Sequence, residues 1–182
     1  MIYIYTFLIL FSFSLYSDPK DKIIHIVKPS NETPQVISKG DAADDPAIWF
    51  NQFSPNNSIV FGTDKRSGVY SYNLAGKKIG YSKLGNINNI DLRSINLNDE
   101  STYTFIVASN RTVGSLDLWI YEDKALDILT KTKKFSLNSN PSFQGISNMV
   151  VYGVCVGFDE EFGVVAFLTE DEGSSVEMWS RS

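Results

Sequence analysis

The sequence predicts an all-β protein built from three copies of one antiparallel unit. Its 182 residues are 43% hydrophobic and include 12 Phe, 9 Tyr and 3 Trp. Aromatic residues, together with Val, Ile and Thr, favour strands. From Asp45 onward, short runs of alternating apolar and polar residues are separated by turn residues, which is typical of half-buried strands. No long segment has convincing helical spacing.

The alternating runs assign the strands in chain order. The first four predicted strands are Pro46–Phe50, Ser58–Thr63, Gly68–Leu74 and Lys78–Leu84. The next four are Asn89–Ile95, Thr102–Ser109, Leu116–Tyr121 and Ala125–Leu129, followed by a predicted polar loop at Lys131–Asn140. The last three are Val150–Phe158, Val164–Thr169 and Val176–Trp179.

Three segments repeat the same order of features. Residues 58–63, 104–109 and 164–169 each form an apolar strand that ends in Ser or Thr, and a polar, charged turn and a strand with aromatic residues follow each one. Units of roughly 40–50 residues with about four strands are typical of β-propeller blades. The sequence therefore predicts about three blades of four-stranded antiparallel sheet. An ordinary antiparallel sandwich, which has similar strand spacing, is the alternative.

A dense acidic stretch precedes the first predicted strand. Asp41, Asp44 and Asp45 lie within a few residues of one another, and their carboxylates repel unless water, a cation or hydrogen-bond donors intervene. Hard oxygen ligands at this density suit Ca²⁺. Pro46 has no N–H and fits the first residue of a strand, so the acidic side chains would lie at the strand's start. A solvated acidic loop is the alternative.

Propeller geometry would gather acidic and basic side chains on one face. In a blade, the loop before the first strand and the hairpin between the second and third strands lie at the same end. The side chains expected to meet there are those of Asp44, Asp45, Lys65, Arg66, Asn89, Asp91, Arg111, Tyr152, Asp171 and Glu172. Carboxylates and amides supply oxygens for Ca²⁺, and Lys and Arg donate to phosphate. The set indicates a site for a polyanion, with structural ion pairing as the alternative.

The amino-terminal residues and the net charge restrict localisation and partners. Met1–Ser17 carries no charged side chain, and its apolar core has the length of a signal peptide rather than a membrane span. We expect residues 1–17 to be cleaved and the protein to be secreted or periplasmic, with a buried first strand or a retained anchor as alternatives.

The net charge of −5 argues against nucleic-acid binding. Cys155 is the only cysteine, and we expect a buried thiol.

Five motifs, in this order, resemble those of the β-propeller phytases: Asp41–Trp49, Thr63–Gly68, Asn88–Arg93, Ala108–Arg111 and Val151–Gly153. The resemblance implies a partial propeller domain over residues 18–182, in a family whose complete members have six blades and bind several calcium ions. Such enzymes hydrolyse phytate (myo-inositol hexakisphosphate) to lower inositol phosphates and phosphate. The calcium ions offset substrate charge and prepare a water or hydroxide for attack on phosphorus. The implied activity is that of an alkaline, calcium-dependent 3-phytase.

The resemblance also implies roles for individual residues. The catalytic residues would be Asp44, Lys65, Arg111 and Tyr152. The groups that bind substrate phosphate would be Lys65, Arg66, Arg111, Tyr152 and Glu172. The calcium ligands would be Asp44, Asp45, Asn89 and Asp91. The third hairpin departs from the family pattern, because many members have a basic residue before the Glu, whereas here Asp171 precedes Glu172.

The length of the chain suffices for about three blades, whereas closed propellers need roughly four to eight. We therefore expect the N-terminal portion of a longer phytase. The remaining blades would come from the rest of that chain, from identical chains or from a partner. The alternative functions are a non-catalytic propeller module, which binds calcium, polyanions or a protein partner, and a different phosphoesterase on the same scaffold.

Overall fold

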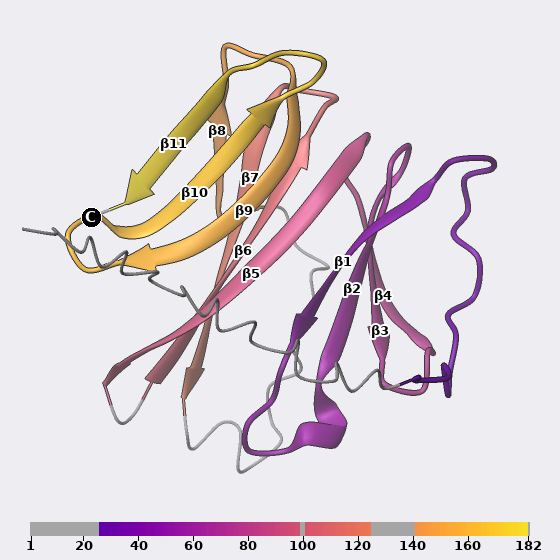
Figure 1. The fold of residues 1–182 in the computed structure, drawn as a ribbon. Helices are drawn as coiled ribbons and strands as arrows, with labels where there is room; N and C mark the ends of the chain where they lie inside the picture. Colours follow the sequence, from indigo (N-terminus) through magenta and orange to yellow (C-terminus); the bar gives the residue numbers. More distant parts are fainter. Residues whose placement is uncertain (1–25, 99–100, 125–140, 182) are drawn as a thin grey trace, which may run out of the picture. The chain divides into compact units, whose positions relative to one another are not determined.

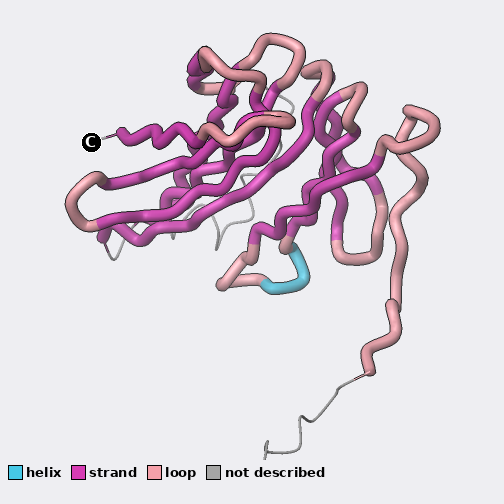
Figure 2. Tube along the Cα trace, turned by 45° about the horizontal axis from the view of Figure 1, so that its top comes forward, coloured by secondary structure: helices cyan, strands magenta, loops and turns pink. Residues whose placement is uncertain are grey.

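The computed structural model describes residues 26–98, 101–124 and 141–181. The chain divides into two units, Met1–Ser30 and Asn31–Ser182, and all described strands belong to the second. Apart from a short 3₁₀ turn, η1 (Pro55–Asn57), its regular structure consists of strands (Figure 2). The predicted all-β fold is confirmed. The predicted signal peptide, residues 1–17, lies outside the described residues. Within those residues, no helix is long and apolar enough to cross a membrane.

The strands form three antiparallel sheets in which each strand pairs with its neighbour in sequence (Figure 1). The first sheet contains β1 (Ala43–Trp49), β2 (Ile59–Asp64), β3 (Gly68–Asn73) and β4 (Lys78–Lys83). The second contains β5 (Ile87–Asn98), β6 (Ser101–Asn110), β7 (Ser115–Lys124) and β8 (Phe143–Ile146). The third contains β9 (Val151–Asp159), β10 (Gly163–Glu170) and β11 (Val176–Arg181). In the described part of the chain, the third sheet thus has three strands rather than the predicted four.

The second sheet ends in a strand that the sequence pattern did not predict. β8 has four residues, too few for a clear alternation. Gly145 lies so close to the ring of Trp179 that a Cβ would overlap it, and Gln144 Nε2 donates to Asp117 Oδ1 at 2.7 Å. Contacts with distant residues therefore define this strand. The predicted strand Ala125–Leu129 and the predicted loop Lys131–Asn140 lie outside the described residues.

The first strands of the three sheets share one irregularity. In each, one extra residue is inserted against the second strand near the start of the pairing. The pairing steps from Ala43↔Asp64 to Pro46↔Gly62 in β1, from Ile87↔Asn110 to Ile90↔Ala108 in β5, and from Val151↔Glu170 to Val154↔Leu168 in β9. Such a β-bulge re-aims side chains and is frequent beside functional sites. Because the three bulges match, they align the three units residue by residue.

Two apolar clusters lie between neighbouring sheets. The cluster between the first and second sheets contains Phe61 and Ile106, and the cluster between the second and third contains Val107 and Leu168. Successive residues of a strand point to opposite faces, so Ile106 and Val107 bury both faces of the second sheet. The second sheet is therefore packed between the other two.

The predicted burial of Cys155 is wrong. This cysteine is exposed and lies on β9, opposite Phe167 of β10. The bulge alignment matches it with Ala47 of β1, which is buried against the second sheet. The corresponding face of the third sheet has exposed apolar side chains, Phe167 and Met178 among them. An apolar run at this position therefore does not imply burial of the thiol.

Candidate functional site

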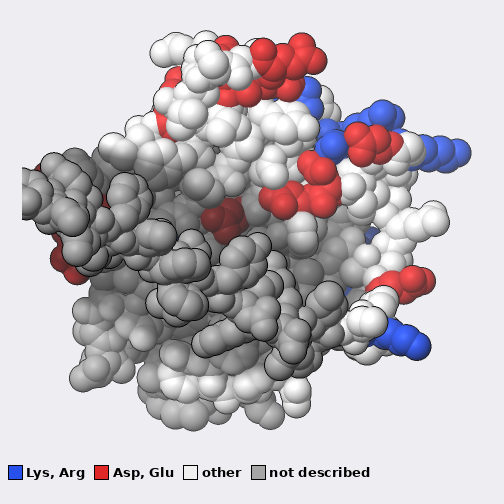
Figure 3. Space-filling view, in the orientation of Figure 1, with Lys and Arg blue, Asp and Glu red and all other residues white. Residues whose placement is uncertain are grey.

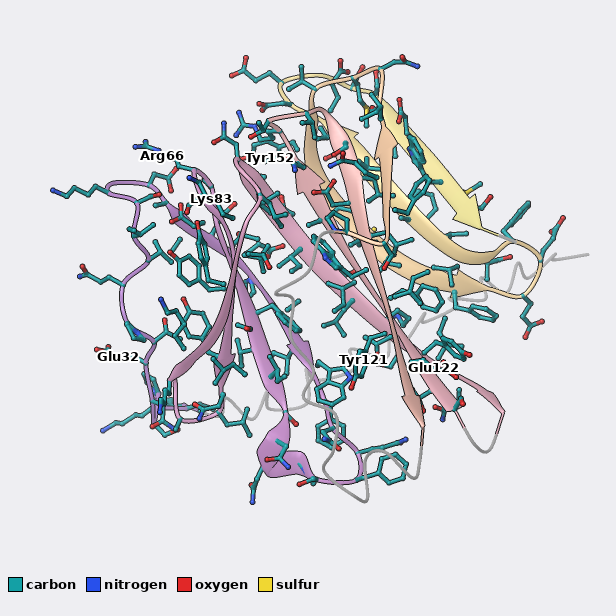
Figure 4. All side chains as sticks on the ribbon, turned by 180° about the vertical axis from the view of Figure 1, so that it is seen from behind. Glu32, Arg66, Lys83, Tyr121, Glu122 and Tyr152 are labelled. Carbon is teal, nitrogen blue, oxygen red and sulfur yellow. The ribbon has the colours of Figure 1, made fainter. Side chains whose placement is uncertain are left out.

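The three bulges bring polar side chains to one end of the sheets. The bulged residues are Asp44–Asp45 in β1, Asn88–Asn89 in β5 and Tyr152–Gly153 in β9. The turns that follow the second strand of each sheet start at the same end, with Lys65, Arg111 and Asp171. Figure 4 shows Arg66 and Tyr152 at this end and Tyr121 and Glu122 at the other. The structure thus brings the hairpins close to the starts of the first strands.

A hydroxyl group closes each bulge. The second residue of each bulged pair donates its backbone N–H to the last Ser or Thr of the second strand: Asp45 N to Thr63 Oγ1 (2.9 Å), Asn89 N to Ser109 Oγ (2.9 Å) and Gly153 N to Thr169 Oγ1 (3.0 Å). Two of these hydroxyls also donate to the next sheet, Thr63 Oγ1 to Asn88 O (2.8 Å) and Ser109 Oγ to Tyr152 O (2.6 Å). The repeated Ser/Thr was visible in the sequence, but this role was not.

Asp45 links the first sheet to the second. Its Oδ2 accepts hydrogen bonds from Ile90 N (3.1 Å) and Asn89 Nδ2 (2.9 Å). Hydrogen bonds to an ionised acceptor are stronger than neutral ones, so Asp45 helps to fix the position of β5 beside β1. The predicted ligands Asp45 and Asn89 do lie together. A metal ion would have to use the oxygens that this contact leaves.

Asp91 makes a similar link from the second sheet to the third. Its Oδ2 accepts from Val156 N and its Oδ1 from Leu92 N, both at 2.8 Å. It lies beyond the bulge, paired with Val107. Both carboxylate oxygens therefore hold backbone N–H groups, and as a calcium ligand Asp91 would share an oxygen with one of them.

Lys65 lies between two carboxylates of the acidic stretch. Its Nζ is 3.1 Å from Asp41 Oδ2 and 3.4 Å from Asp44 Oδ1. The hydrogen bond to Asp41 and the nearby charge of Asp44 raise the pKa of Lys65 above its ordinary value, although partial desolvation opposes them. The ammonium group is therefore charged at neutral pH. The predicted meeting of Asp44 and Lys65 occurs, while the contact with Asp41 was not foreseen.

Arg111 is held by three other groups. Its backbone N–H donates to Asn86 O at 2.8 Å, its Cζ lies 5.7 Å from the ring centroid of Tyr152, and its Nη2 lies 3.0 Å from Asp171 Oδ2. A guanidinium over an aromatic face is a favourable cation–π contact. Arg111, Tyr152 and Asp171 therefore form one cluster of predicted site residues.

Two predicted residues, Arg66 and Glu172, lie in the hairpin turns but outside the contacts described above. The guanidinium of Arg66 donates from Nη1 to Lys39 O at 3.2 Å. Glu172 is exposed and has a backbone φ of 55°, in the left-handed region that residues other than Gly rarely adopt. Both residues lie in the hairpin turns at the candidate site.

Asn88 is a site residue that the sequence did not single out. It is buried, its Nδ2 donates to Asn89 Oδ1 (2.7 Å), and its buried Oδ1 has no hydrogen-bond partner among the described residues. A buried carbonyl oxygen without a partner is costly, so such a group needs an explanation. The bulge alignment matches Asn88 with Asp44 and Tyr152, two of the predicted catalytic residues.

The charge of this end of the sheets is mixed and predominantly acidic. In the predicted set, together with Asp41, six carboxylates accompany three basic groups: Asp41, Asp44, Asp45, Asp91, Asp171 and Glu172 accompany Lys65, Arg66 and Arg111. Figure 3 shows acidic and basic side chains next to one another on the described surface. Among the described residues, no three Asp, Glu, His or Cys side chains form a group that could hold a metal ion.

Comparison with known proteins places these residues in a wider context. The model of the protein family described as Phytase matches residues 6–176. The 3-phytase of Bacillus subtilis (strain 168) is 35% identical over 152 residues, which make up 81% of this chain and 38% of that protein. The chain thus spans less than half the length of this relative.

Proposed function

Because the chain belongs to the phytase family, we propose that its site serves the calcium-dependent hydrolysis of phytate to lower inositol phosphates and phosphate, as in a 3-phytase. The observation that carries this proposal is the shared end of the three sheets. There, matching bulges present Asp44, Asn88–Asn89 and Tyr152 beside the basic side chains of Lys65 and Arg111.

The residues at this end fit calcium in their chemistry. Ca²⁺ takes six to eight oxygen ligands from carboxylates, amides, backbone carbonyls and water. The buried Oδ1 of Asn88, which has no partner within the described part of the chain, is an oxygen of this kind, and the excess of carboxylates would favour a cation. The residues that would hold calcium are Asp44, Asp45, Asn89 and Asp91, with Asn88 added by the structure. When bound, calcium supplies charge neutralisation and an activated water.

The chain's own basic groups would bind and orient the phosphates. Lys65 supplies a mobile ammonium donor, and Arg111 a planar guanidinium that can bind phosphate through two parallel hydrogen bonds. The ring of Tyr152 would help to orient the guanidinium, and the hydrogen bond from Arg111 N to Asn86 O would hold the backbone of the turn. Arg66, in the same turn as Lys65, would contact a more distant phosphate.

For the architecture, we propose that the three sheets are blades of a larger propeller. The matching bulges support this proposal, as does the packing of the second sheet between two others. The exposed apolar face of the third sheet, with Phe167, Val176 and Met178, would then pack against a further blade from the remainder of a longer chain. A structure of the complete gene product tests this, and a Phe167 exposed to solvent there would contradict it.

We also propose that the protein is exported, because Met1–Ser17 has the composition of a signal peptide. Determination of the N-terminal residue of the protein recovered outside the cytoplasm tests this proposal. A mature chain that begins near Asp18 is the expected result, and an uncleaved Met1 would contradict it.

Phosphate release from phytate is the experiment that tests the activity. The full-length product of the gene, with the 182-residue chain in parallel, is assayed with calcium and with a chelator. We expect release only with calcium, and Asp44→Asn and Arg111→Met should each reduce turnover about 10²–10³-fold. Lys77→Met is the matched control, since Lys77 lies in the turn between β3 and β4, at the opposite end of the first sheet.

A non-catalytic module is the second candidate function. It is favoured by the ion pairs of Lys65 and Arg111, because the carboxylates of Asp44 and Asp171 already neutralise these two bases. Binding of phytate without phosphate release, in a full-length product with calcium, would support this function and overturn the enzymatic one. Activity that survives both Asp44→Asn and Arg111→Met would overturn the assignment of the site.

A further inference from the structure

We propose that Asp171 is an internal counter-ion of Arg111, which an anionic ligand must displace, and that it thereby sets how strongly the site binds polyanions. This inference rests on the proposed function, because it concerns the same site. It names Asp171 as a residue that tunes affinity rather than as a catalytic group.

The contact with Asp171 uses part of the donor edge of Arg111 that a phosphate would also use. Nη2 of Arg111 is 3.0 Å from Asp171 Oδ2, and the two side chains are 35% and 23% exposed. The Cζ atom of Arg111 lies over the ring of Tyr152. Because the N–H groups of a guanidinium lie in its plane, ligands approach at its edge, where Asp171 already binds. Phosphate and carboxylate therefore compete for the same donors.

The backbone of Asp171 is fixed, so its carboxylate is held in this place. Asp171 N donates to Val150 O at 2.8 Å, and Glu170 N donates to Ser175 O at 3.1 Å. Glu170 Oε2 accepts from Ser175 N at 3.2 Å, which closes the turn between β10 and β11. Release of Arg111 therefore requires rotation of the Asp171 side chain and not rearrangement of the turn.

Lys65 differs from Arg111 in how its ammonium group could be separated from its carboxylate partner. One of its partners, Asp44, belongs to the predicted calcium ligands, so a bound cation would draw that carboxylate away from the ammonium group. Asp171 lies outside that set. Even with calcium present, Arg111 would therefore remain paired until a ligand displaces the carboxylate.

Removal of the Asp171 charge should strengthen the binding of a polyanion. A doubly charged phosphate about 5 Å from a carboxylate is repelled by roughly 1.5 kcal/mol in water, which corresponds to about tenfold in affinity, and salt weakens this effect. We therefore expect Asp171→Asn to tighten binding about tenfold at low ionic strength. The gain should shrink as salt is added.

The test is calorimetric titration of phytate into the full-length product of the gene, with calcium present. Asp171→Asn is compared with wild type and with Glu160→Gln. Glu160 lies in the turn between β9 and β10, at the opposite end of the third sheet, so this control removes the same charge far from the site. We expect a change of less than about twofold for the control. Circular dichroism verifies that each variant is folded.

A double variant separates a local effect from a general one. If Asp171 acts through Arg111, the gain from Asp171→Asn should disappear in an Arg111→Met background. A gain that persists there would overturn the inference, as would equal or weaker binding by Asp171→Asn while the wild type binds phytate. If neither wild type nor Asp171→Asn binds phytate, the proposed function itself fails together with the inference.

Discussion

The first and third sheets contain the same repeated unit in two different surroundings. Phe61 of β2 and Phe167 of β10 occupy aligned positions, yet their exposed fractions are 0% and 38%. Val69 of β3 and Val176 of β11, which pair with Thr63 and Thr169, are 1% and 62% exposed. The second sheet covers these side chains of the first, whereas no described strand covers those of the third.

The hydroxyl groups of Thr63 and Thr169, at the bulges of the first and third sheets, also differ in whether a neighbouring sheet contacts them. Thr63 and Thr169 both accept a hydrogen bond from the bulge of their own sheet. Thr63 also donates to Asn88 O of the next sheet, whereas Thr169 has no such acceptor within the described part of the chain. Contacts within a sheet therefore follow from the unit's own sequence, and contacts between sheets depend on the neighbour.

The largest expected difference is between Phe61→Ala and Phe167→Ala. The first removes a fully buried ring and should lower the free energy of unfolding by about 3–5 kcal/mol. The second removes a ring that is already partly in water in the 182-residue chain, so in that chain we expect a loss of less than about 1.5 kcal/mol. Urea unfolding measures both. Equal losses would mean that a neighbour covers the third sheet in solution.

The carboxylate of Asp45, which accepts hydrogen bonds from the second sheet, provides the next test. Asp45→Ala removes the acceptor of Ile90 N and Asn89 Nδ2, and we expect a loss of about 1.5–3 kcal/mol of unfolding free energy. Asp44→Ala is the matched control, because Asp44 makes an ion pair with Lys65 at the surface, which contributes less than about 1 kcal/mol. If both variants lost the same stability, Asp45 would not have this structural role.

The bulge hydroxyls offer a comparison with one substitution at two aligned sites. Thr63→Val keeps the shape of the side chain but removes two hydrogen bonds, and should cost about 1–2 kcal/mol of unfolding free energy. Thr169→Val removes one described hydrogen bond in the third sheet. It should lower the free energy of unfolding by about 0.5 kcal/mol. Thermal or urea unfolding measures the difference. A larger loss for Thr169→Val would show that its hydroxyl has an acceptor in solution.

The strands and the repeat could be predicted because both depend on short-range patterns. Alternation located the strands, and the repeated Ser/Thr aligned the units. The contacts of Lys65 with Asp44 and of Arg111 with Tyr152 followed from the expected geometry of the hairpins. Those predictions used only the order of residues along the chain.

What the sequence could not predict depends on partners far along the chain. β8 is defined by Gln144 and Gly145, through their contacts with Asp117 and Trp179. The exposure of Cys155 depends on whether a neighbour covers its sheet. That the Oδ1 of Asn88 lacks a partner among the described residues becomes evident only when the donors around it are known.

The smallest expected effect concerns the ion pairs of Lys65 with Asp41 and Asp44. The hydrogen bond to Asp41 raises the pKa of Lys65 above 10.5, so the ion pair stabilises the fold fully below that pH. The contribution is lost as the pH rises through the higher value of the folded state. The difference in urea midpoint between wild type and Lys65→Met should therefore be small near pH 8 and should shrink as the pH rises above 10.5. Arg111→Met is the control, because a guanidinium keeps its charge over this range. A Lys65→Met difference that grew with pH would contradict the assigned ion pair.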